Sequence, residues 1–242
     1  MTEACFEKIA GQGPLLFLCD HAGNRLPVGT GTLGLDPALF ETHIAYDIGA
    51  AHVTRALAAA FGAPAVLGVF SRLLIDLNRG PDDPTLVMQL SDGSIIPGNR
   101  GITAEEVARR TAQFFAPYHQ AIAEEAVRIA DPVLISLHSF TPAWKTVQRK
   151  WELGVLWDTD GRLAQPLMAH MRQAGFEVGD NEPYSGALEG DTLNRHGTHM
   201  GRPHVLIEMR QDLVYNIDKA KAMAAQLKVI LDAALADMKA AD

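Results

Sequence analysis

The stretch LLFLCDH, at Leu15–His21, is a run of five apolar residues that ends in an aspartate and a histidine. Apolar runs of this length are typical of strands that are buried on both faces of a sheet. Similar runs follow along the chain, at Ala65–Phe70, Val133–Leu137 and Val205–Met209. Helical patterns separate them, so the sequence predicts an α/β fold with helices on both faces of the sheet.

The segments between these runs carry the signals of helix ends and loops. Asp47 is well placed to be the N-cap of an Ala-rich helix over Ile48–Phe61. Thr103 and Glu106 form a capping-box pattern, which predicts a helix to about Ala130 that Pro117 should kink or split. Further helices are expected at Leu163–Ala174 and from Ile217 onward, and further strands at Leu73–Leu77 and Leu153–Trp157.

The regions 80–101 and 180–203 are rich in turn residues and have little periodicity. Loops this long in a compact domain are usually functional. A length of 242 residues fits one domain, and we expect residues 1–242 to form a single one.

Composition argues against two classes of partner. The chain has 21 Lys and Arg against 29 Asp and Glu, a net charge of −8, so no overall attraction to the phosphates of nucleic acid is expected. Its apolar runs have the length of strands and are too short to span a membrane. With two cysteines and no signal-peptide pattern at the N-terminus, we expect a cytoplasmic protein with reduced thiols.

Polar side chains follow several of the predicted strands. In open α/β sheets, ligands bind at the carboxyl ends of the strands. A histidine at a strand end can be a metal ligand or a general base, whereas a lone histidine there can simply bond a backbone carbonyl. The residues placed at such ends are His21, Asn24, Asn78, Arg79, His138, Glu208 and Arg210.

Glu208 lies inside the apolar run VLIEM, where a carboxylate must be paired or have a shifted pKa. Such a site suits a catalytic base, and the alternative is a structural ion pair with Arg210 or another arginine. Arg79 can hold a substrate carboxylate with two hydrogen bonds, or it can neutralise Asp76 or Asp82 at the surface.

Other signals are weak or missing. His196 and His199 resemble a metal pair, but they lie in a Gly-rich loop and are interpreted as loop histidines without a metal. The chain has no Gly-x-Ser-x-Gly elbow and no phosphate-binding glycine motif. A serine hydrolase of the common α/β type and a nucleotide-binding protein are therefore not favoured.

Several blocks of the chain resemble the N-formylglutamate amidohydrolase family, and the likeness is greatest to a divergent branch of that family that is known mainly from predictions. The blocks run from near residue 15 to near residue 215 and therefore cover most of the chain. They are CDHAGNRLP (Cys19–Pro27), DIGA (Asp47–Ala50), SRLLIDLNR (Ser71–Arg79), DGSIIPGN (Asp92–Asn99), SLHSFTP (Ser136–Pro142), PYSG with GDTLNRHG (Pro183–Gly197) and IEMRQDL (Ile207–Leu213).

That family is in turn similar to the zinc carboxypeptidases in fold and site layout, which implies a mixed, twisted sheet of the phosphorylase/hydrolase-like kind. The resemblance also implies roles for particular positions. It places zinc ligands at His21, Asn24 and His138, the substrate-carboxylate pair at Asn78-Arg79, the general base in Glu208-Met209-Arg210, and a substrate-binding loop tyrosine at Tyr184.

Asn24 departs from this pattern, because it stands where a zinc-binding carboxylate is usual. A neutral amide oxygen is a poorer zinc ligand than a carboxylate. Either Asn24 still coordinates weakly, or another carboxylate such as Asp47 completes the ligand set, or the metal is bound loosely or not at all.

The resemblance implies a metal-dependent hydrolase, with zinc as cofactor, that cleaves an N-formyl or other N-acyl amino acid, above all N-formylglutamate. Glu208 would move the proton of the attacking water, and Arg72 or Arg79 would stabilise the oxyanion. Two alternatives stay open. The same metal site could cleave another N-acyl amino acid or a C-terminal peptide bond, or the chain could be a non-catalytic carboxylate-binding protein with a decayed metal site.

Overall fold

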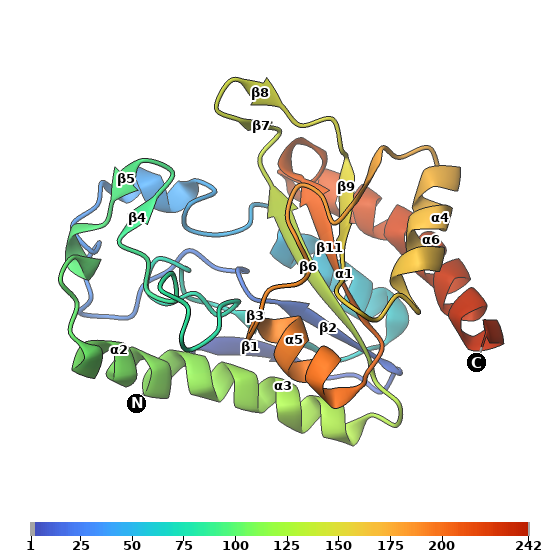
Figure 1. Ribbon diagram of the computed structural model, residues 1–242, viewed down its shortest axis with the longest axis horizontal. Helices are drawn as coiled ribbons and strands as arrows, with labels where there is room; N and C mark the ends of the chain where they lie inside the picture. The colour runs from blue at the N-terminus through green and yellow to red at the C-terminus, as the bar shows by residue number, and fades with distance from the viewer. Residues whose placement is uncertain (1–2, 242) are drawn as a thin grey trace.

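A seven-stranded mixed sheet forms the centre of the computed structural model, which describes residues 3–241 (Figure 1). The strand order is β1-β3-β2-β6-β11-β9-β10. Strands β3, β2, β6 and β11 run parallel, while β1 and β9 are antiparallel to their neighbours β3 and β11. The bounds are β1 Phe6–Ile9, β2 Leu15–Cys19, β3 Ala65–Gly68, β6 Val133–Phe140, β9 Leu153–Leu156, β10 Val178–Asp180 and β11 His204–Arg210.

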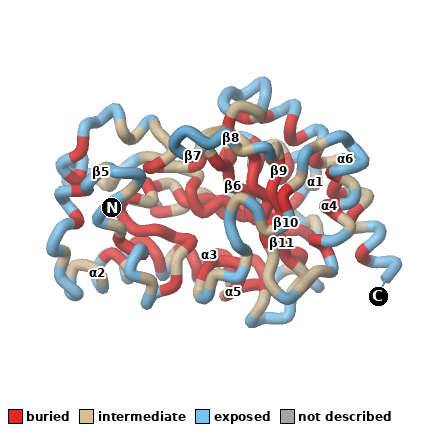
Figure 2. The backbone as a smooth tube through the Cα atoms, turned by 45° about the horizontal axis from the view of Figure 1, so that its top comes forward, coloured by how far each residue is buried: buried red, intermediate tan, exposed pale blue. Residues whose placement is uncertain are grey.

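Helices cover both faces of the sheet, as the sequence predicts. Helices α1 (Ala50–Phe61), α4 (Ala164–Gln173) and α6 (Ile217–Ala241) lie on one side, and α2 (Ala104–Arg110) and α3 (Ala116–Arg128) lie on the other with α5 (Thr192–His196) (Figure 1). Strand β2 shows why both faces are apolar. Its alternate side chains Leu15, Phe17 and Cys19 enter one core, and Leu16 and Leu18 enter the other. The buried stretches therefore gather in the middle of the molecule (Figure 2).

Two short hairpins and several short helices complete the fold. The hairpins are β4 (Leu90–Ser91) with β5 (Ser94–Ile95), and β7 (Ala143–Trp144) with β8 (Val147–Gln148). Short 3₁₀ helices lie at Pro37–Glu41, Pro97–Asn99, Thr198–Met200 and Gln211–Leu213. Among residues 3–241, no helix combines the length and the apolar character needed to cross a membrane.

The predicted capping box is present, since Thr103 Oγ1 accepts a hydrogen bond from the Glu106 backbone N–H at 3.2 Å. The distortion expected at Pro117 takes the form of a π-helical segment, Thr111–Phe115, directly before α3. Proline cannot donate to the preceding turn, and such a segment is one way in which a long helix accommodates that loss.

The prediction of a strand over Leu73–Leu77 is wrong, because this buried segment consists of turns and irregular chain. Its carbonyl groups are satisfied by side chains instead of a neighbouring strand. Asn99 Nδ2 donates to the Leu73 carbonyl at 2.8 Å, and Arg110 Nη1 donates to the Leu74 carbonyl at 2.8 Å. Buried carbonyls need such partners, and here they come from residues more than 25 positions away.

The expected N-cap role of Asp47 is also wrong. Helix α1 begins at Ala50, and its N-cap is Gly49 with a positive φ of 85° and no side-chain hydrogen bond. A Cβ on Gly49 would lie 2.1 Å from the Val214 carbonyl oxygen, so only glycine fits there. The Asp47 side chain points instead to the histidines that follow β2 and lie in β6.

Candidate metal and catalytic site

Three neighbouring strands bring the main candidate residues together. Strand β6 lies between β2 and β11 in the sheet, and all three are parallel. His21 follows β2 by two residues, His138 lies two residues before the end of β6, and Glu208 is the register partner of His138 on β11. Parallel strands end at the same edge of the sheet, so residues more than 180 positions apart meet there.

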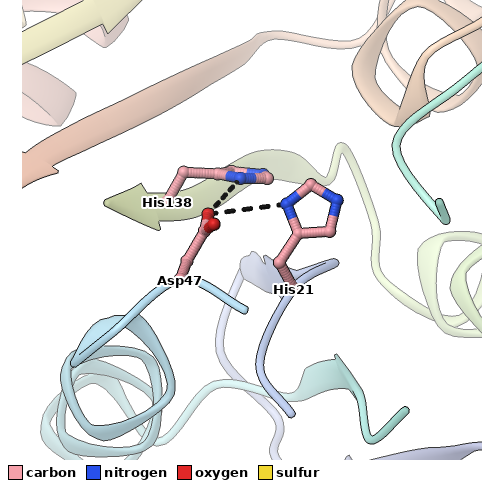
Figure 3. Close-up of side chains that lie close together, drawn as sticks. All are labelled: His21, Asp47 and His138. Atoms are coloured by element: carbon pink, nitrogen blue, oxygen red, sulfur yellow. Dashed lines mark hydrogen bonds and ion pairs between the residues drawn. The ribbon is translucent and has the colours of Figure 1, made fainter. Parts of the chain in front are cut away.

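A buried cluster of His21, Asp47 and His138 lies at this edge (Figure 3). One ligand atom from each residue lies within 4.8 Å of the others. Asp47 Oδ2 is 2.8 Å from His138 Nδ1 and 3.5 Å from His21 Nδ1, and the two rings have their centroids 5.0 Å apart. Two imidazoles and one carboxylate are a donor set that catalytic zinc uses, with a position left open for water or substrate.

Local geometry supports the interpretation of this cluster as a metal site. His21 Nδ1 is buried and has no hydrogen-bond partner among residues 3–241, because its contact with Asp47 lacks hydrogen-bond geometry. A buried polar atom without a partner costs free energy, and a cation between the three residues would remove that cost. The donors present therefore fit a divalent metal ion.

Two further carboxylates are hydrogen-bonded to the Nε2 atoms of the two histidines. His21 Nε2 is 2.7 Å from Asp76 Oδ1, and His138 Nε2 is 3.0 Å from Asp20 Oδ2. A carboxylate accepts a hydrogen bond from the Nε2–H group, which leaves Nδ1 as the ligand atom that faces the cluster. Burial lowers the pKa of His138, but its hydrogen bonds with Asp20 and Asp47 outweigh burial and hold that pKa well above its ordinary value.

Asp20 is the centre of a buried hydrogen-bond network. Besides His138 it accepts from Thr192 Oγ1 at 2.5 Å, from Tyr118 Oη at 3.1 Å and from Ser136 Oγ at 3.1 Å. Burial raises the pKa of Asp20, and the hydrogen bond and charge of His138 lower it by more, so Asp20 stays ionised. The sequence analysis did not select Asp20, although a carboxylate directly before His21 at a strand end was a signal for it.

Glu208 lies next to the cluster without a hydrogen bond to its Oε2 atom among the described residues, and its side chain is buried. The pKa of Glu208 is raised to about 7, because burial and the charge of Asp47 raise it by more than His138 and Arg72 lower it. A carboxyl group with a pKa near the working pH can both accept and return a proton.

The structure does not bring Arg210 to the site. Its guanidinium bonds Asp212, with Nε 2.7 Å from Oδ1, and the backbone carbonyl of Trp151. The alternative of an ion pair between Glu208 and Arg210 is therefore not formed, and Glu208 remains free to face the cluster.

Asn24 also lies apart from the cluster. Its Nδ2 donates to the Phe40 carbonyl at 2.9 Å and to Glu41 Oε1 at 3.2 Å. The carboxylate that faces both histidines is Asp47, which the loop before α1 carries. Of the alternatives that the sequence leaves open for the third ligand, the geometry favours Asp47.

Two arginines face the same cavity with different partners. Arg72 Nη1 donates to Asp47 Oδ1 at 3.2 Å, and its Nη2 and Nε donate to Asp76 Oδ2 at 3.1 and 3.3 Å. Arg79 bonds Thr85 Oγ1 and the Asn78 carbonyl, and it has no carboxylate partner within ion-pair distance in the described part of the chain. Arg79 is therefore the guanidinium that is available to an anionic ligand.

Asn78 is hydrogen-bonded to two segments next to the cluster. Its Oδ1 accepts a hydrogen bond from the Thr192 backbone N–H at 3.1 Å, and its own N–H donates to Asp76 Oδ1 at 2.9 Å. The first contact joins the segment after Leu77 to the loop at residues 180–203, and the second holds the turn at Asp76 in place.

The cavity has a volume of about 590 Å³, which is enough for a small-molecule substrate. Both long loops contribute to its walls, as their length predicted. They supply Met88, Leu90, Asp92, Tyr184, Leu188 and Asp191, alongside His21, Asp47, Arg72, Arg79, His138 and Glu208.

Asp191 is a wall residue that the sequence analysis missed. It is the N-cap of α5, where its Oδ1 accepts from the Asn194 N–H at 2.7 Å. Burial raises its pKa to about 6, which the hydrogen bond to Asn194 opposes. The sequence signal for it was an aspartate directly before a short helix in the GDTLNRHG segment.

Comparisons with known proteins identify the family of the chain. The profile of a family described as N-formylglutamate amidohydrolase matches residues 13–215. A curated protein of Pseudomonas aeruginosa, N-formylglutamate deformylase, is 27% identical over 93% of this chain and 94% of its own length.

Solved structures show the same fold. The gene product Atu2144 from Agrobacterium tumefaciens is 34% identical, with a TM-score of 0.92 over 98% of this chain and 97% of its own. An N-formylglutamate amidohydrolase from Ralstonia eutropha has a TM-score of 0.73 over 98% of this chain and 100% of its own, at 22% identity. The match to the family profile covers most of the chain, and the protein is therefore an enzyme of the N-formylglutamate amidohydrolase family.

Proposed function

We propose that this enzyme hydrolyses the amide bond of an N-formyl amino acid, with N-formylglutamate as the main substrate, and releases formate and the free amino acid. The observation that carries the proposal is the buried His21, Asp47 and His138 cluster with Glu208 beside it. The same cavity presents the guanidinium of Arg79, which has no carboxylate partner among the residues that the structure describes. The names of the family and of its curated relative supply the substrate class.

His21, Asp47 and His138 are the residues that would hold a divalent ion, and their nitrogen and oxygen donors suit zinc. Such an ion, when bound, supplies Lewis acidity that polarises the amide carbonyl and makes nearby water more acidic. Asp20 and Asp76 keep the two imidazoles oriented with Nδ1 toward it.

Glu208 is the proton carrier of the reaction. As a carboxylate it takes a proton from the attacking water, and as a carboxylic acid it then gives that proton to the leaving nitrogen. Its pKa of about 7 allows both states at neutral pH.

The arginines act on the charges of the substrate. Arg72 is held by Asp47 and Asp76 at the edge of the cluster, where it stabilises negative charge that develops on the carbonyl oxygen. Arg79 has no carboxylate partner within residues 3–241 and binds a substrate carboxylate. Tyr184 lies in the wall of the same cavity and contributes a further polar contact to the substrate.

The test is formate release from a panel of N-formyl and N-acetyl amino acids by the purified protein. We expect turnover of N-formylglutamate with zinc present, loss after treatment with a chelator, and recovery when zinc is restored. Turnover that the chelator leaves unchanged would contradict the metal role. Binding of glutamate without turnover of any acylated compound would instead identify a carboxylate-binding protein.

A further inference from the structure

Arg149 lies directly after the β7–β8 hairpin, at the mouth of the cavity, and three aromatic rings surround it. Its guanidinium carbon is 5.2 Å from the ring centroid of Tyr184, 5.5 Å from that of Phe140 and 5.8 Å from that of Trp144. All three rings line the cavity. A guanidinium is attracted to the face of an aromatic ring, so the three contacts together hold it in one place.

Hydrogen bonds fix the orientation of the same side chain. Arg149 Nη1 donates to the carbonyl oxygen and to Oγ1 of Thr141, at 3.2 and 3.1 Å, and Nη2 donates to Tyr184 Oη at 3.1 Å. No Asp or Glu lies within ion-pair distance of Arg149 in the part of the chain that the structure describes. Its Tyr184 contact is therefore not a by-product of an ion pair elsewhere.

The chemistry of the two groups determines which of them donates. A guanidinium has donors and no acceptor, so the phenol oxygen of Tyr184 must accept from Arg149. The phenol hydrogen has no acceptor among residues 3–241, and the ring faces the cavity. That hydrogen is consequently free to be donated to a ligand in the cavity.

We propose that Arg149 is a positioning residue, which holds the phenol oxygen of Tyr184 as an acceptor and so presents the phenol hydrogen to a carboxylate oxygen of the substrate. The inference rests on the proposed function, because it assigns the contact to an anionic N-formyl amino acid. A neighbouring cation also makes a phenol a stronger donor, since it draws electron density from the oxygen.

The position of Tyr184 determines which kinetic constant it affects. The side chain is 45% exposed at the rim, whereas the reacting carbonyl must lie at the buried cluster. A substrate carboxylate carries its charge before, during and after the reaction. A contact to it therefore stabilises substrate and transition state equally, which lowers KM and leaves kcat unchanged.

The loop that carries Tyr184 has a second anchor, so Arg149 variants can be interpreted. Asn181 Oδ1 accepts hydrogen bonds from the backbone N–H groups of Trp157 and Gly186, at 3.1 and 2.9 Å. These bonds hold the loop on both sides of Tyr184 without Arg149. Loss of the guanidinium should thus change the phenol and leave the loop in place.

The experiment is a double-mutant cycle on formate release from N-formylglutamate, with Arg149→Gln, Tyr184→Phe and the double variant. We expect each single variant to raise KM about tenfold, the effect of one hydrogen bond to a charged group at a partly exposed site, with kcat within twofold. Because both changes remove the same contact, the double variant should be no worse than Tyr184→Phe alone. Multiplied effects in the double variant would overturn the proposal.

Two further variants sharpen the test. Arg149→Lys keeps a donor without an acceptor and should recover part of the loss, whereas glutamine can itself accept the phenol hydrogen and should not. Lys150→Gln is the matched control, because it removes the adjacent positive charge, which lies over Trp151, and should leave KM unchanged. An equal rise in KM for Lys150→Gln would mean that general charge, and not the Tyr184 contact, is responsible.

The outcomes also separate this inference from the proposed function. A wild-type enzyme that releases no formate contradicts the function, and the inference with it. A wild-type enzyme that is active, with a lower kcat in Arg149→Gln or with no effect of Tyr184→Phe, contradicts the inference alone. Hydrogen exchange across residues 143–148 would show in either case whether the hairpin itself has loosened.

Discussion

Replacement of Asp191 by asparagine should stabilise the protein. The residue is 5% exposed, and burial raises the pKa of its carboxyl group from the ordinary 3.8 to about 6. Each pKa unit corresponds to 1.36 kcal/mol, so at neutral pH the folded state carries a cost of about 3 kcal/mol for keeping this group ionised.

The pH dependence follows from the direction of the pKa change. The folded state binds the Asp191 proton more tightly than the unfolded state does. The contribution of Asp191 to the free energy of unfolding is therefore least favourable at a pH where its carboxyl group is ionised. Stability is therefore lost as the pH rises from about 4 to about 6, and it stays lost above that range. The cost is about 0.5 kcal/mol at pH 4 and about 3 kcal/mol at pH 7.5.

Asparagine removes the charge and keeps the cap. Its side-chain oxygen can accept the same hydrogen bond from the Asn194 N–H that Asp191 accepts at 2.7 Å. Asp191→Asn should therefore exceed the wild type in free energy of unfolding by about 2–3 kcal/mol at pH 7.5 and by about 0.5 kcal/mol at pH 4.

Urea unfolding of the chelator-treated protein at the two pH values measures this difference. Asp191→Ala is the control, because it removes both the charge and the cap and should gain about 1 kcal/mol less than asparagine. The same difference between Asp191→Asn and the wild type at both pH values would refute the reasoning, since a cost of ionisation must vanish when the group is protonated.

Three other predictions concern the cluster and the cavity. Glu208→Gln should bind zinc in the same ratio as the wild type, measured by atomic absorption, but lose turnover by several orders of magnitude, because an amide cannot accept the water proton. Asp20→Asn should lower the affinity for zinc about 10- to 100-fold in chelator competition, because it weakens the support of His138. Arg79→Ala should raise KM for N-formylglutamate about tenfold or more and leave kcat nearly unchanged, because Arg79 binds a charge that is constant through the reaction.

Each of these outcomes can fail in an informative way. Residual turnover near the wild-type level would remove Glu208 from the mechanism, and unchanged zinc affinity would reduce Asp20 to a structural residue. A fall in kcat without a change in KM for Arg79→Ala would mean that the guanidinium acts on the reacting carbonyl and not on the substrate carboxylate.

The strands of the parallel core could be predicted from the sequence, because residues buried on both faces leave continuous apolar runs. Leu15–Cys19 is a strand with the predicted bounds, and Val133–Leu137 and Val205–Met209 lie within β6 and β11. Leu73–Leu77 has the same composition and is no strand. A pattern of apolar residues reports burial, and it does not report whether a strand or the side chains of Asn99 and Arg110 will satisfy the backbone.

The candidate site could be predicted only in part, for a related reason. The positions of His21, His138 and Glu208 at strand ends are visible in the sequence, and the sheet places them together. Asp47 is a residue type that can cap a helix or face a cation, and local sequence cannot choose between these roles. The partners Asp20 and Asp76 depend on which strands become neighbours, so they emerge only when the chain is folded.

The hydrogen bond between Thr192 and Asp20 has a consequence for how substrate reaches the cavity. Thr192 belongs to the cavity wall that residues 180–203 form, and Asp20 is hydrogen-bonded to His138. The hydrogen bond from Thr192 to Asp20 therefore connects this wall to the centre of the site. Displacement of this wall would break the bond from Thr192 to Asp20, the carboxylate that supports the imidazole of His138. Entry of substrate that leaves residues 180–203 in place would keep Asp20 bonded to both Thr192 and His138.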